Sequence, residues 1–386
     1  MQSSQVAWPV FFSYVGYAIF SILVAAAILE IGSGIVLSAY HRIRNGTEEG
    51  LTSPEYQGYP WAQAFWKEEL LRRESSPKQG RYIPFLIWGE RPWHGKYINV
   101  DESAMGGLRR TVNPMNPACN EARRKVIWMF GGSTLFGVGV PDMETIPSNL
   151  SKELNSTGSG CFVILNAGVE GYLTNQELIL LVESLKTGQR PDVVIFYDGV
   201  NDANAAVDPG IANAHLQFEF IKARMEGSFA SKFDWLRNSH SLELARAIVA
   251  RFRNGDSPAS LPEVEQRAAA ALDNYEANMR IVRSLGLAYN FEVFCFWQPS
   301  LATGGKPLTP FEQELQKDGN SLQILRAVNE VAARRALQTG SFVFLGQIFD
   351  SVKEPLYIDH LMHVGPRGNQ IVAKAIAKWM ESHARN

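Results

Sequence analysis

Two short stretches of this chain hold the residue types that nucleophilic catalysis needs. In "FGGSTLFGVG", two glycines permit a tight turn after an apolar run, and Ser133 stands at the apex of that turn. A serine hydroxyl in such a place is well suited to act as a nucleophile. Later in the chain, "YIDHLMHVGPRGN" brings Asp359, His360 and His363 within five residues, which indicates a base for that serine.

Two loops between these stretches offer neutral hydrogen-bond donors. "NAGVEGYLTN" contains Gly171, whose backbone N–H can approach a ligand with no side chain in the way. "YDGVNDAN" contains Asn201, whose side-chain amide is a second donor. Together with the Ser133 N–H, these groups could converge on one developing oxyanion, where each donor can stabilise the transition state by about 3 kcal/mol.

Hydrophobic patterning predicts the elements that must position these residues. Five short apolar runs are typical of buried parallel strands: "KVIWMF", "CFVILN", "DVVIFY", "FEVFCFW" and "FVFLGQIF". Helical spacing of apolar residues occurs in "NQELILLVESLK", from Asn274 to Leu285, and in "GNQIVAKAIAKWM". Alternating strands and helices predict an open α/β sheet with helices on both faces, which binds ligands at the carboxyl ends of its strands.

The pattern divides the chain into three parts. We expect a transmembrane anchor in residues 1–43, a linker with a small β-containing extension in 44–120, and the α/β domain in 121–386. An interval at about 203–271 is too long for a plain crossover, and we interpret it as a helical insertion beside the site. Helices are predicted there from Ala214 to Met225 and from Leu242 to Phe252.

The N-terminal segment differs from the rest of the chain. Val6 to Leu29 carries no charge, and a bilayer span takes about 20 apolar residues. No Lys or Arg precedes Arg42, whereas a cleaved signal peptide has a basic start. We therefore expect a retained single-pass anchor. Arg42 and Arg44 follow the span and favour a cytoplasmic C-terminal side, but large domains translocate past such weak flanks, and the side stays open.

Composition excludes some classes of function and leaves others. The chain has 386 residues, is 46% hydrophobic and 20% charged, and has a net charge of -2. These values are typical of a globular protein without the basic surface that nucleic-acid binding needs. The three cysteines are an odd number without CxxC spacing, and two of them fall in apolar runs, so we interpret them as structural thiols.

The order of the candidate blocks resembles the SGNH hydrolases, the GDSL-type esterase and lipase superfamily, from about Lys125 onward. The resemblance implies a three-layer α/β/α, flavodoxin-like fold with a five-stranded parallel sheet. The transmembrane helix expected from the N-terminal apolar run precedes this fold and lies outside the resemblance. It implies Ser133 in "GGST" as nucleophile, and an oxyanion hole of Ser133, Gly171 in "NAGVEG" and Asn201 in "GVND". His363 in "HVGPRGN" matches the family's base, because a short loop and a "GN" helix start follow it.

This sequence departs from the family pattern at two positions. Gly132 stands where the GDS motif has Asp. The family's Asp lies three residues before the His, but here that position is His360 and Asp359 lies four before. Either Asp359 still orients His363, which we prefer, or the enzyme uses a Ser-His pair with another orienting group, for which Asp350 is a weaker choice.

A further reading takes Asp359, His360 and His363 as metal ligands, since His-x-x-His can bind zinc. No other strong ligand cluster accompanies them, so we predict neither a metal nor a cofactor.

The resulting hypothesis is a membrane-anchored serine esterase that removes acyl groups, notably acetyl, from carbohydrate or lipid-like substrates through Ser133, His363 and Asp359. Its expected partners are the acyl ester, a polysaccharide or lipid, and the membrane, with no nucleic acid. Two alternatives remain. One is an O-acyltransferase that uses the same residues with a sugar hydroxyl in place of water. The other is a catalytically silent, membrane-tethered carbohydrate-binding module, which the aromatic stretch near Trp88 and Trp93 would suit.

Overall fold

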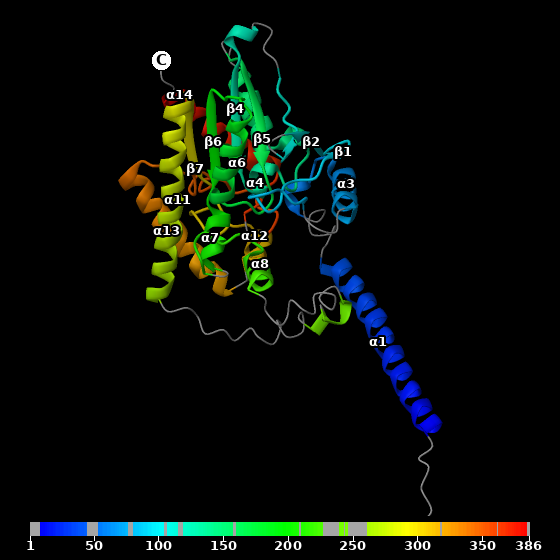
Figure 1. Cartoon of the computed structure of the whole chain (residues 1–386). Coiled ribbons are helices and arrows are strands. Elements are labelled where there is room, and N and C mark those ends of the chain that lie inside the picture. Colours follow the sequence, from blue (N-terminus) through cyan, green and yellow to red (C-terminus); the bar gives the residue numbers. More distant parts are fainter. Residues whose placement is uncertain are drawn as a thin grey trace, which may run out of the picture. The chain divides into compact units, whose positions relative to one another are not determined.

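The fold is that of a computed structural model of the chain (Figure 1). It describes residues 8–44, 53–75, 80–103, 106–114, 119–156, 160–207, 210–226, 239–242, 244–245, 261–316, 319–360 and 362–383. The chain divides into two compact units. The N-terminal unit comprises Met1–Gly46 and Glu219–Pro258, and the α/β unit comprises Thr47–Phe218 and Ala259–Asn386.

A parallel sheet forms the centre of the α/β unit. Its strands are β4 (Lys125–Gly131), β5 (Phe162–Gly168), β6 (Val193–Asp198), β7 (Glu292–Trp297) and β8 (Val343–Phe344). They lie in the order β5-β4-β6-β7-β8, and all four neighbouring pairs are parallel. In chain order this is 2-1-3-4-5, the flavodoxin-like arrangement. Each strand overlaps one of the five apolar runs, so the predicted five parallel strands are confirmed.

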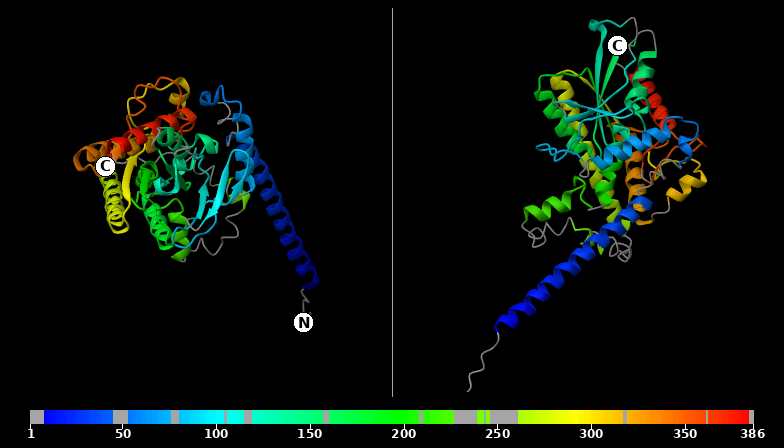
Figure 2. Two further views of the ribbon diagram at one scale, coloured as in Figure 1. Left: turned by 90° about the horizontal axis from the view of Figure 1, so that it is seen from above. Right: turned by 90° about the vertical axis from the view of Figure 1, so that its right-hand side faces the viewer.

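Helices cover both faces of this sheet, because successive side chains of a strand point to opposite faces. Ile127 and Met129 of β4 pack in one core with helices α5 (Ile146–Ser156) and α14 (Pro366–His383). Trp128 and Phe130 pack in the other core. That second core includes residues of α6 (Thr174–Lys186), α7 (Val200–Val207), α11 (Leu261–Tyr289) and α13 (Gly319–Thr339). In Figure 2, the red α14 and the yellow α11 lie on opposite sides of the sheet.

Three antiparallel strands extend the sheet to eight. They are β1 (Trp93–His94), β2 (Asn99–Ser103) and β3 (Gly106–Arg109), and the full order is β1-β2-β3-β5-β4-β6-β7-β8. Helix α3 (Ala62–Ser75) precedes them. The described part of residues 44–120 therefore holds α3 and three strands at the edge of the main sheet.

A buried ion pair joins this extension to the parallel part. Arg109 pairs with Asn166 of β5 in the sheet, and its Nε lies 2.5 Å from Asp142 Oδ1, with the two side chains 1% and 9% exposed. The Arg109 guanidinium also lies over the ring of Phe136, 4.9 Å from its centre. The remaining short elements are η1 (Pro54–Tyr56), η2 (Glu121–Arg123), α4 (Ser133–Phe136), η3 (Asp142–Glu144) and α12 (Pro310–Leu315).

The N-terminal unit contains one long apolar helix, α1 (Trp8–Arg44). Its segment Gly16–Leu37 is long and apolar enough to cross a membrane, and only 6% of that segment is buried. The first charge along the helix, Glu30, accepts hydrogen bonds from the His240 N–H at 2.5 Å and the Ser241 hydroxyl at 2.7 Å. Its length and composition suit a membrane anchor or a signal sequence.

The interval at about 203–271 holds described elements of both units. Helix α8 (Phe218–Met225) falls within the predicted helix from Ala214 to Met225. Most of the predicted helix from Leu242 to Phe252 lies outside the described residues. Ala203 and Ala206 of α7 and Ala268 and Ala271 of α11 are buried in the core, so the two ends of the interval belong to the α/β packing.

The cysteines differ from the predicted set of thiols. Cys119 and Cys161 form a disulfide with Cα atoms 5.3 Å apart, and Cys295 is a buried free thiol. The prediction was wrong for the pair because the sequence separation of 42 residues hid their proximity. The pairing of β4 with β5, which places Lys125 opposite Phe162, brings their N-terminal ends together.

Candidate active site

Ser133 is the first residue of α4, directly after the turn that ends β4. Gly131 packs against backbone and Gly132 against a side chain. A Cβ on Gly131 would lie 2.6 Å from the Tyr197 carbonyl oxygen, and one on Gly132 would lie 2.4 Å from Asn201 Nδ2. Ser133 is 8% exposed.

A chain of hydrogen bonds connects Ser133, His363 and Asp359. His363 Nε2 lies 2.7 Å from Ser133 Oγ, and His363 Nδ1 contacts Asp359 Oδ2. A carboxylate can only accept, so Nδ1 carries the proton of this pair. In the neutral ring Nε2 is then an acceptor and faces the serine hydroxyl, which is the tautomer that a general base requires.

The turn at residues 358–363 explains how Asp359 reaches the histidine from four positions away. The Ile358 N–H donates to the His363 carbonyl oxygen at 3.0 Å, which closes the turn. Asp359 Oδ1 accepts the backbone N–H groups of Met362 at 3.2 Å and His363 at 3.3 Å. The carboxylate therefore folds back over its own turn, while His360 is exposed.

A buried ion pair beneath this turn supports it. Glu312 Oε1 accepts the N–H groups of Leu356 at 2.9 Å and Tyr357 at 3.2 Å, and its Oε2 lies 2.7 Å from Lys306 Nζ. The side chains of Lys306 and Glu312 are 3% and 0% exposed. The strand-like segment before the histidine turn is thus fixed to the loop after β7, a contact that no sequence signal indicated.

The environment of His363 raises its pKa above the ordinary value of 6.5. Burial by itself lowers the pKa, because it disfavours the charged ring. The Asp359 charge and its hydrogen bond act in the opposite direction and outweigh burial. Glu170 raises the pKa further, whereas Arg73 lowers it. Two charged groups outside the predicted site therefore act on the candidate base.

Asn201 and Gly171 approach the serine from two other strand ends. Asn201, the second residue of α7, donates from Nδ2 to the Tyr172 carbonyl oxygen at 2.6 Å, and this amide nitrogen is the atom that borders Gly132. An amide has two N–H groups, so one remains for a ligand. Gly171 has φ +80, which suits glycine, in the turn closed by Tyr172 N–H donating to Val169 O at 3.2 Å.

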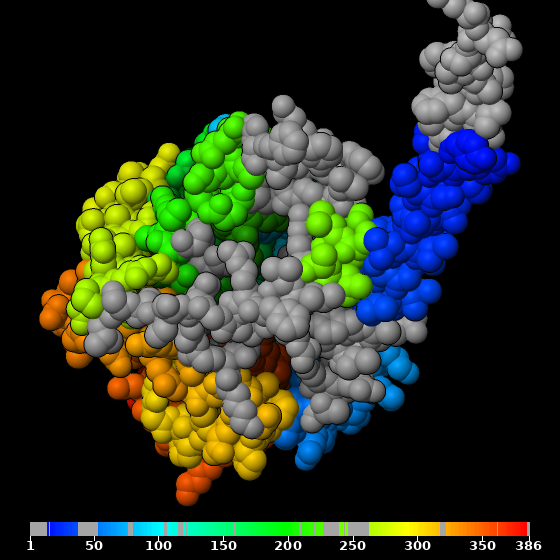
Figure 3. All heavy atoms as spheres, turned by 90° about the horizontal axis from the view of Figure 1, so that it is seen from below, coloured from blue at the N-terminus to red at the C-terminus, as the bar shows by residue number. Residues whose placement is uncertain are grey.

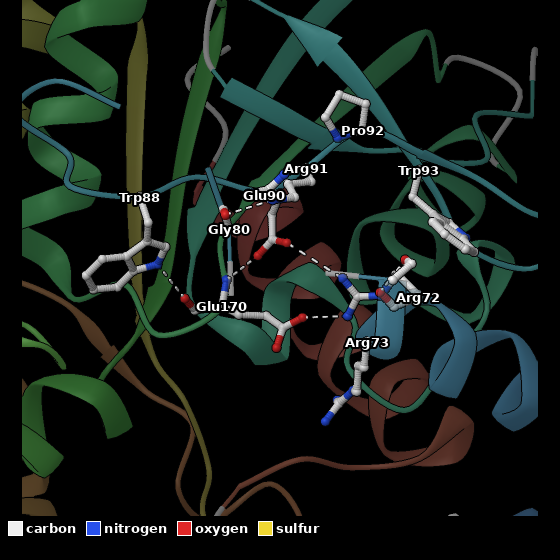
Figure 4. A pocket seen from close by; sticks show the side chains of 10 residues that line it. Arg72, Arg73, Gly80, Trp88, Glu90, Arg91, Pro92, Trp93 and Glu170 are labelled. Carbon is white, nitrogen blue, oxygen red and sulfur yellow. Dashed lines mark hydrogen bonds and ion pairs between the residues drawn. The ribbon is translucent and has the colours of Figure 1, made fainter. Parts of the chain in front are cut away.

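The extension holds the residue before Gly171 through both its backbone and its side chain. The Glu170 N–H donates to Glu90 Oε1 at 2.9 Å, and the Glu170 carbonyl oxygen accepts the Trp88 indole N–H at 3.0 Å. Arg72 Nη2 donates to the Glu170 carboxylate at 2.7 Å. Figure 4 shows these contacts around Glu170. No motif in the sequence predicts these contacts, although the aromatic stretch with Trp88 indicates that this segment packs against another part of the chain.

The alternative that Asp359, His360 and His363 bind a metal has no support from the side-chain arrangement in the described part of the chain. No three His, Cys, Asp or Glu side chains gather there as ligands for an ion. In the turn, Asp359 uses both carboxylate oxygens on His363 and backbone N–H groups.

The site lies at the edge of the sheet where the parallel strands end. In Figure 3 this edge is seen from below, with the yellow surface of α11 and the amber surface of residues around 300–316 at its border. Open α/β sheets bind ligands at this edge.

Comparison with known proteins gave fold-level likenesses only. No family model matches this chain, and no curated protein matches it. Among solved structures, an acetyl xylan esterase is 17% identical with a TM-score of 0.36, covering 66% of this chain and 98% of its own. An acetylxylan esterase from Geobacillus stearothermophilus is 16% identical with a TM-score of 0.35, covering 68% and 95%. A member of the lipolytic protein G-D-S-L family from Veillonella parvula DSM 2008 is 13% identical with a TM-score of 0.34, covering 68% and 99%. Values this low assign no activity to this chain.

Proposed function

We propose that this chain is a serine esterase of the SGNH type that removes acyl groups, notably acetyl, from hydroxyl-bearing substrates. The observation that supports it is the chain of contacts from Ser133 Oγ through the two ring nitrogens of His363 to the Asp359 carboxylate. The order of the parallel strands and the glycine turn before Ser133 agree with this family's architecture.

In the proposed reaction, Ser133 Oγ attacks the ester carbonyl carbon while His363 Nε2 takes the hydroxyl proton. The negative charge that develops on the carbonyl oxygen is stabilised by the N–H groups of Ser133 and Gly171 and by the Asn201 amide. His363 then gives its proton to the leaving alcohol as the C–O bond breaks. Water attacks the acyl-serine with His363 again as base, which releases the carboxylic acid and restores the serine.

We further infer that α1 is a retained membrane anchor and that the α/β unit lies outside the cytoplasm. The length and exposure of the apolar segment support the anchor. The Cys119–Cys161 disulfide supports the side, because disulfides persist in oxidising compartments and are rare in the cytosol. Arg42 and Arg44 alone favoured the opposite side, but flanking charges are weak determinants for large domains.

A fluorophosphonate probe tests the nucleophile directly. We expect stoichiometric labelling of the intact protein, peptide mapping to Ser133, and loss of labelling in Ser133→Ala and His363→Ala. The exposed His360 provides the matched control, and His360→Ala should label at the wild-type rate. Labelling that persists in Ser133→Ala, or its absence in folded protein, would rule out the proposed esterase.

A further inference from the structure

A pocket of about 500 Å³ lies beside the candidate active site, and its walls come largely from the extension. Charged and aromatic side chains line it: Arg72, Arg73, Glu90, Arg91, Trp93 and Glu170. They come from α3, from the segment leading into β1, and from the loop after β5. Figure 4 shows them from close by. Neither the predicted catalytic residues nor the proposed oxyanion hole accounts for this set.

The carboxylates of the pocket already have partners within the protein. Glu90 Oε1 accepts the Glu170 N–H, and Glu90 Oε2 lies 3.8 Å from Arg72 Nη1. Glu170 Oε1 lies 2.7 Å from Arg72 Nη2. Arg72 in turn donates from Nε to Glu69 at 2.8 Å. Arg72 and these carboxylates therefore form a network that holds the loop before Gly171 in place.

Two other arginines of the pocket, Arg73 and Arg91, have N–H donors that a ligand could use. Arg73 donates from Nε to Glu69 Oε1 at 2.6 Å, and its side chain is 52% exposed. Its terminal nitrogens Nη1 and Nη2 have no hydrogen-bond partner among the described residues. In Figure 4 its guanidinium points away from the Glu90 and Glu170 carboxylates. Arg91 donates from Nε to the Gly80 carbonyl oxygen at 2.9 Å and is exposed. The cationic donors of the pocket that its own carboxylates do not hold are thus those of Arg73 and Arg91, and the Trp93 indole N–H is a neutral donor beside them.

This pocket is electrostatically linked to the candidate base. Glu170 directly precedes Gly171 of the proposed oxyanion hole. The charges of both Glu170 and Arg73 act on the pKa of His363. Because Glu170 lines the pocket and directly precedes Gly171, the pocket adjoins the proposed oxyanion hole, and the alcohol part of a substrate held there can extend into it.

We propose that this pocket binds the alcohol part of the substrate, and that this part is a sugar bearing an anionic group that Arg73 and Arg91 hold. The planar, forked guanidinium suits a carboxylate or a phosphate. Trp93 and Pro92, which also lines the pocket, provide apolar surface for the C–H face of a sugar ring. The proposal rests on the proposed esterase activity and names its substrate class as O-acylated acidic saccharides.

The test compares acetylated oligosaccharides that differ in charge. An acetylated oligogalacturonide supplies carboxylates, an acetylated sugar phosphate supplies phosphate, and an acetylated xylo-oligosaccharide is neutral. We expect wild-type kcat/KM to be higher for an anionic substrate than for the neutral one. Arg73→Gln should lower that ratio by about 10- to 100-fold through KM, the range of a charge-assisted hydrogen bond. Arg73→Lys should restore part of it. The anionic substrate with the higher kcat/KM shows whether the pocket prefers a carboxylate or a phosphate.

Arg110→Gln is the matched control, because Arg110 is 48% exposed, pairs with Asp101 on the same extension and does not line the pocket. It should leave the ratio unchanged. Equal kcat/KM for neutral and anionic substrates in the wild type, or an unchanged ratio in Arg73→Gln, would overturn the proposal.

Binding without turnover separates this proposal from the esterase. Ser133→Ala should bind unacetylated oligogalacturonide or the sugar phosphate in calorimetry, and Arg73→Gln added to it should weaken binding about 10-fold or more. If the wild type fails to react with fluorophosphonate but this binding and its loss are observed, the esterase fails and the pocket stands. If the wild type reacts with the probe but no anion-dependent binding is observed, the esterase stands and the pocket proposal fails.

Discussion

The Asp359 carboxylate performs two tasks within one turn. Oδ1 accepts two backbone N–H groups and fixes the turn, while Oδ2 accepts the His363 ring proton. Spacing along the sequence is therefore a poor guide to this position, because a side chain that folds back over its own turn can reach a ring four residues away. Its role beside the base stays a prediction that substitution can test.

Asp359→Asn should reduce kcat/KM by about 10⁴-fold, since the imidazolium of the transition state loses its support and the wrong tautomer is favoured. The variant should also change the pH profile. His363 acts as a base only when neutral, so activity falls below its pKa, which Asp359 raises. Without that charge, burial lowers the pKa, and the acid limb of kcat/KM should move to lower pH. An unshifted limb with full activity would assign the orienting role to another group.

Gly132 offers a second test at the residue scale. The Cβ of Gly132→Ala would lie 2.4 Å from Asn201 Nδ2, so the amide must leave its place. We expect kcat to fall by about 10²- to 10³-fold, the loss typical of one oxyanion donor, with the fold retained in circular dichroism. Asn201→Ala should cost about as much, and the double variant hardly more. Additive losses would show that the two positions act separately.

At the scale of elements, the extension is part of the α/β unit that holds the candidate site. Strand β3 pairs with β5 of the parallel sheet. Its residue Arg109 forms an ion pair with Asp142 and lies over the ring of Phe136. Phe136 belongs to α4, the helix that begins with Ser133. Trp88 and Glu90 hold the loop before Gly171. Removal of the extension would therefore leave polar groups of the site without their partners.

Arg109→Met should lower the free energy of unfolding by about 3–5 kcal/mol, because Asp142 stays buried without its cation. Urea unfolding followed by tryptophan fluorescence measures this. The adjacent Arg110 is a matched control, since its pair with Asp101 is exposed, and Arg110→Gln should cost about 0–1 kcal/mol. Similar effects of the two substitutions would mean that the junction at β3 contributes little.

At the scale of the whole molecule, the cysteines report the compartment of the α/β unit. In denatured protein from intact cells, an alkylating reagent applied before reduction should modify only Cys295, because Cys119 and Cys161 are paired. After reduction all three should react. Alkylation of all three before reduction would place the unit in a reducing compartment and favour the side indicated by Arg42 and Arg44.

The same preparation tests the anchor. If α1 spans the bilayer, carbonate extraction should leave the full-length chain in the membrane pellet, with the α/β unit sensitive to protease from the non-cytoplasmic side. Release into the supernatant would indicate a cleaved or peripheral segment. The two measurements are independent, because one reports the redox state of the unit and the other the attachment of the chain.

The sequence by itself determined the parallel sheet and the helices around it. Buried strands need continuous apolar runs, and their covering helices need apolar residues at helical spacing, so local patterning predicts both. It also identified Ser133, Gly171 and Asn201 as candidates, because residues at the ends of parallel strands meet at one edge. The charge-free run from Val6 to Leu29 likewise predicted an apolar helix from composition alone.

Only the tertiary structure decided which distant groups meet. The eight-stranded sheet, the Cys119–Cys161 disulfide and the contact of Asp359 with His363 depend on how strands pair and turns fold. The pocket of Arg73 depends on α3 packing beside the loop after β5. The strands β1 to β3 are short and contain polar and glycine residues, so they show little apolar periodicity. Pairing with neighbouring strands stabilises them, and a local pattern does not predict that pairing. Contacts of that kind are set by the whole chain and leave no local pattern.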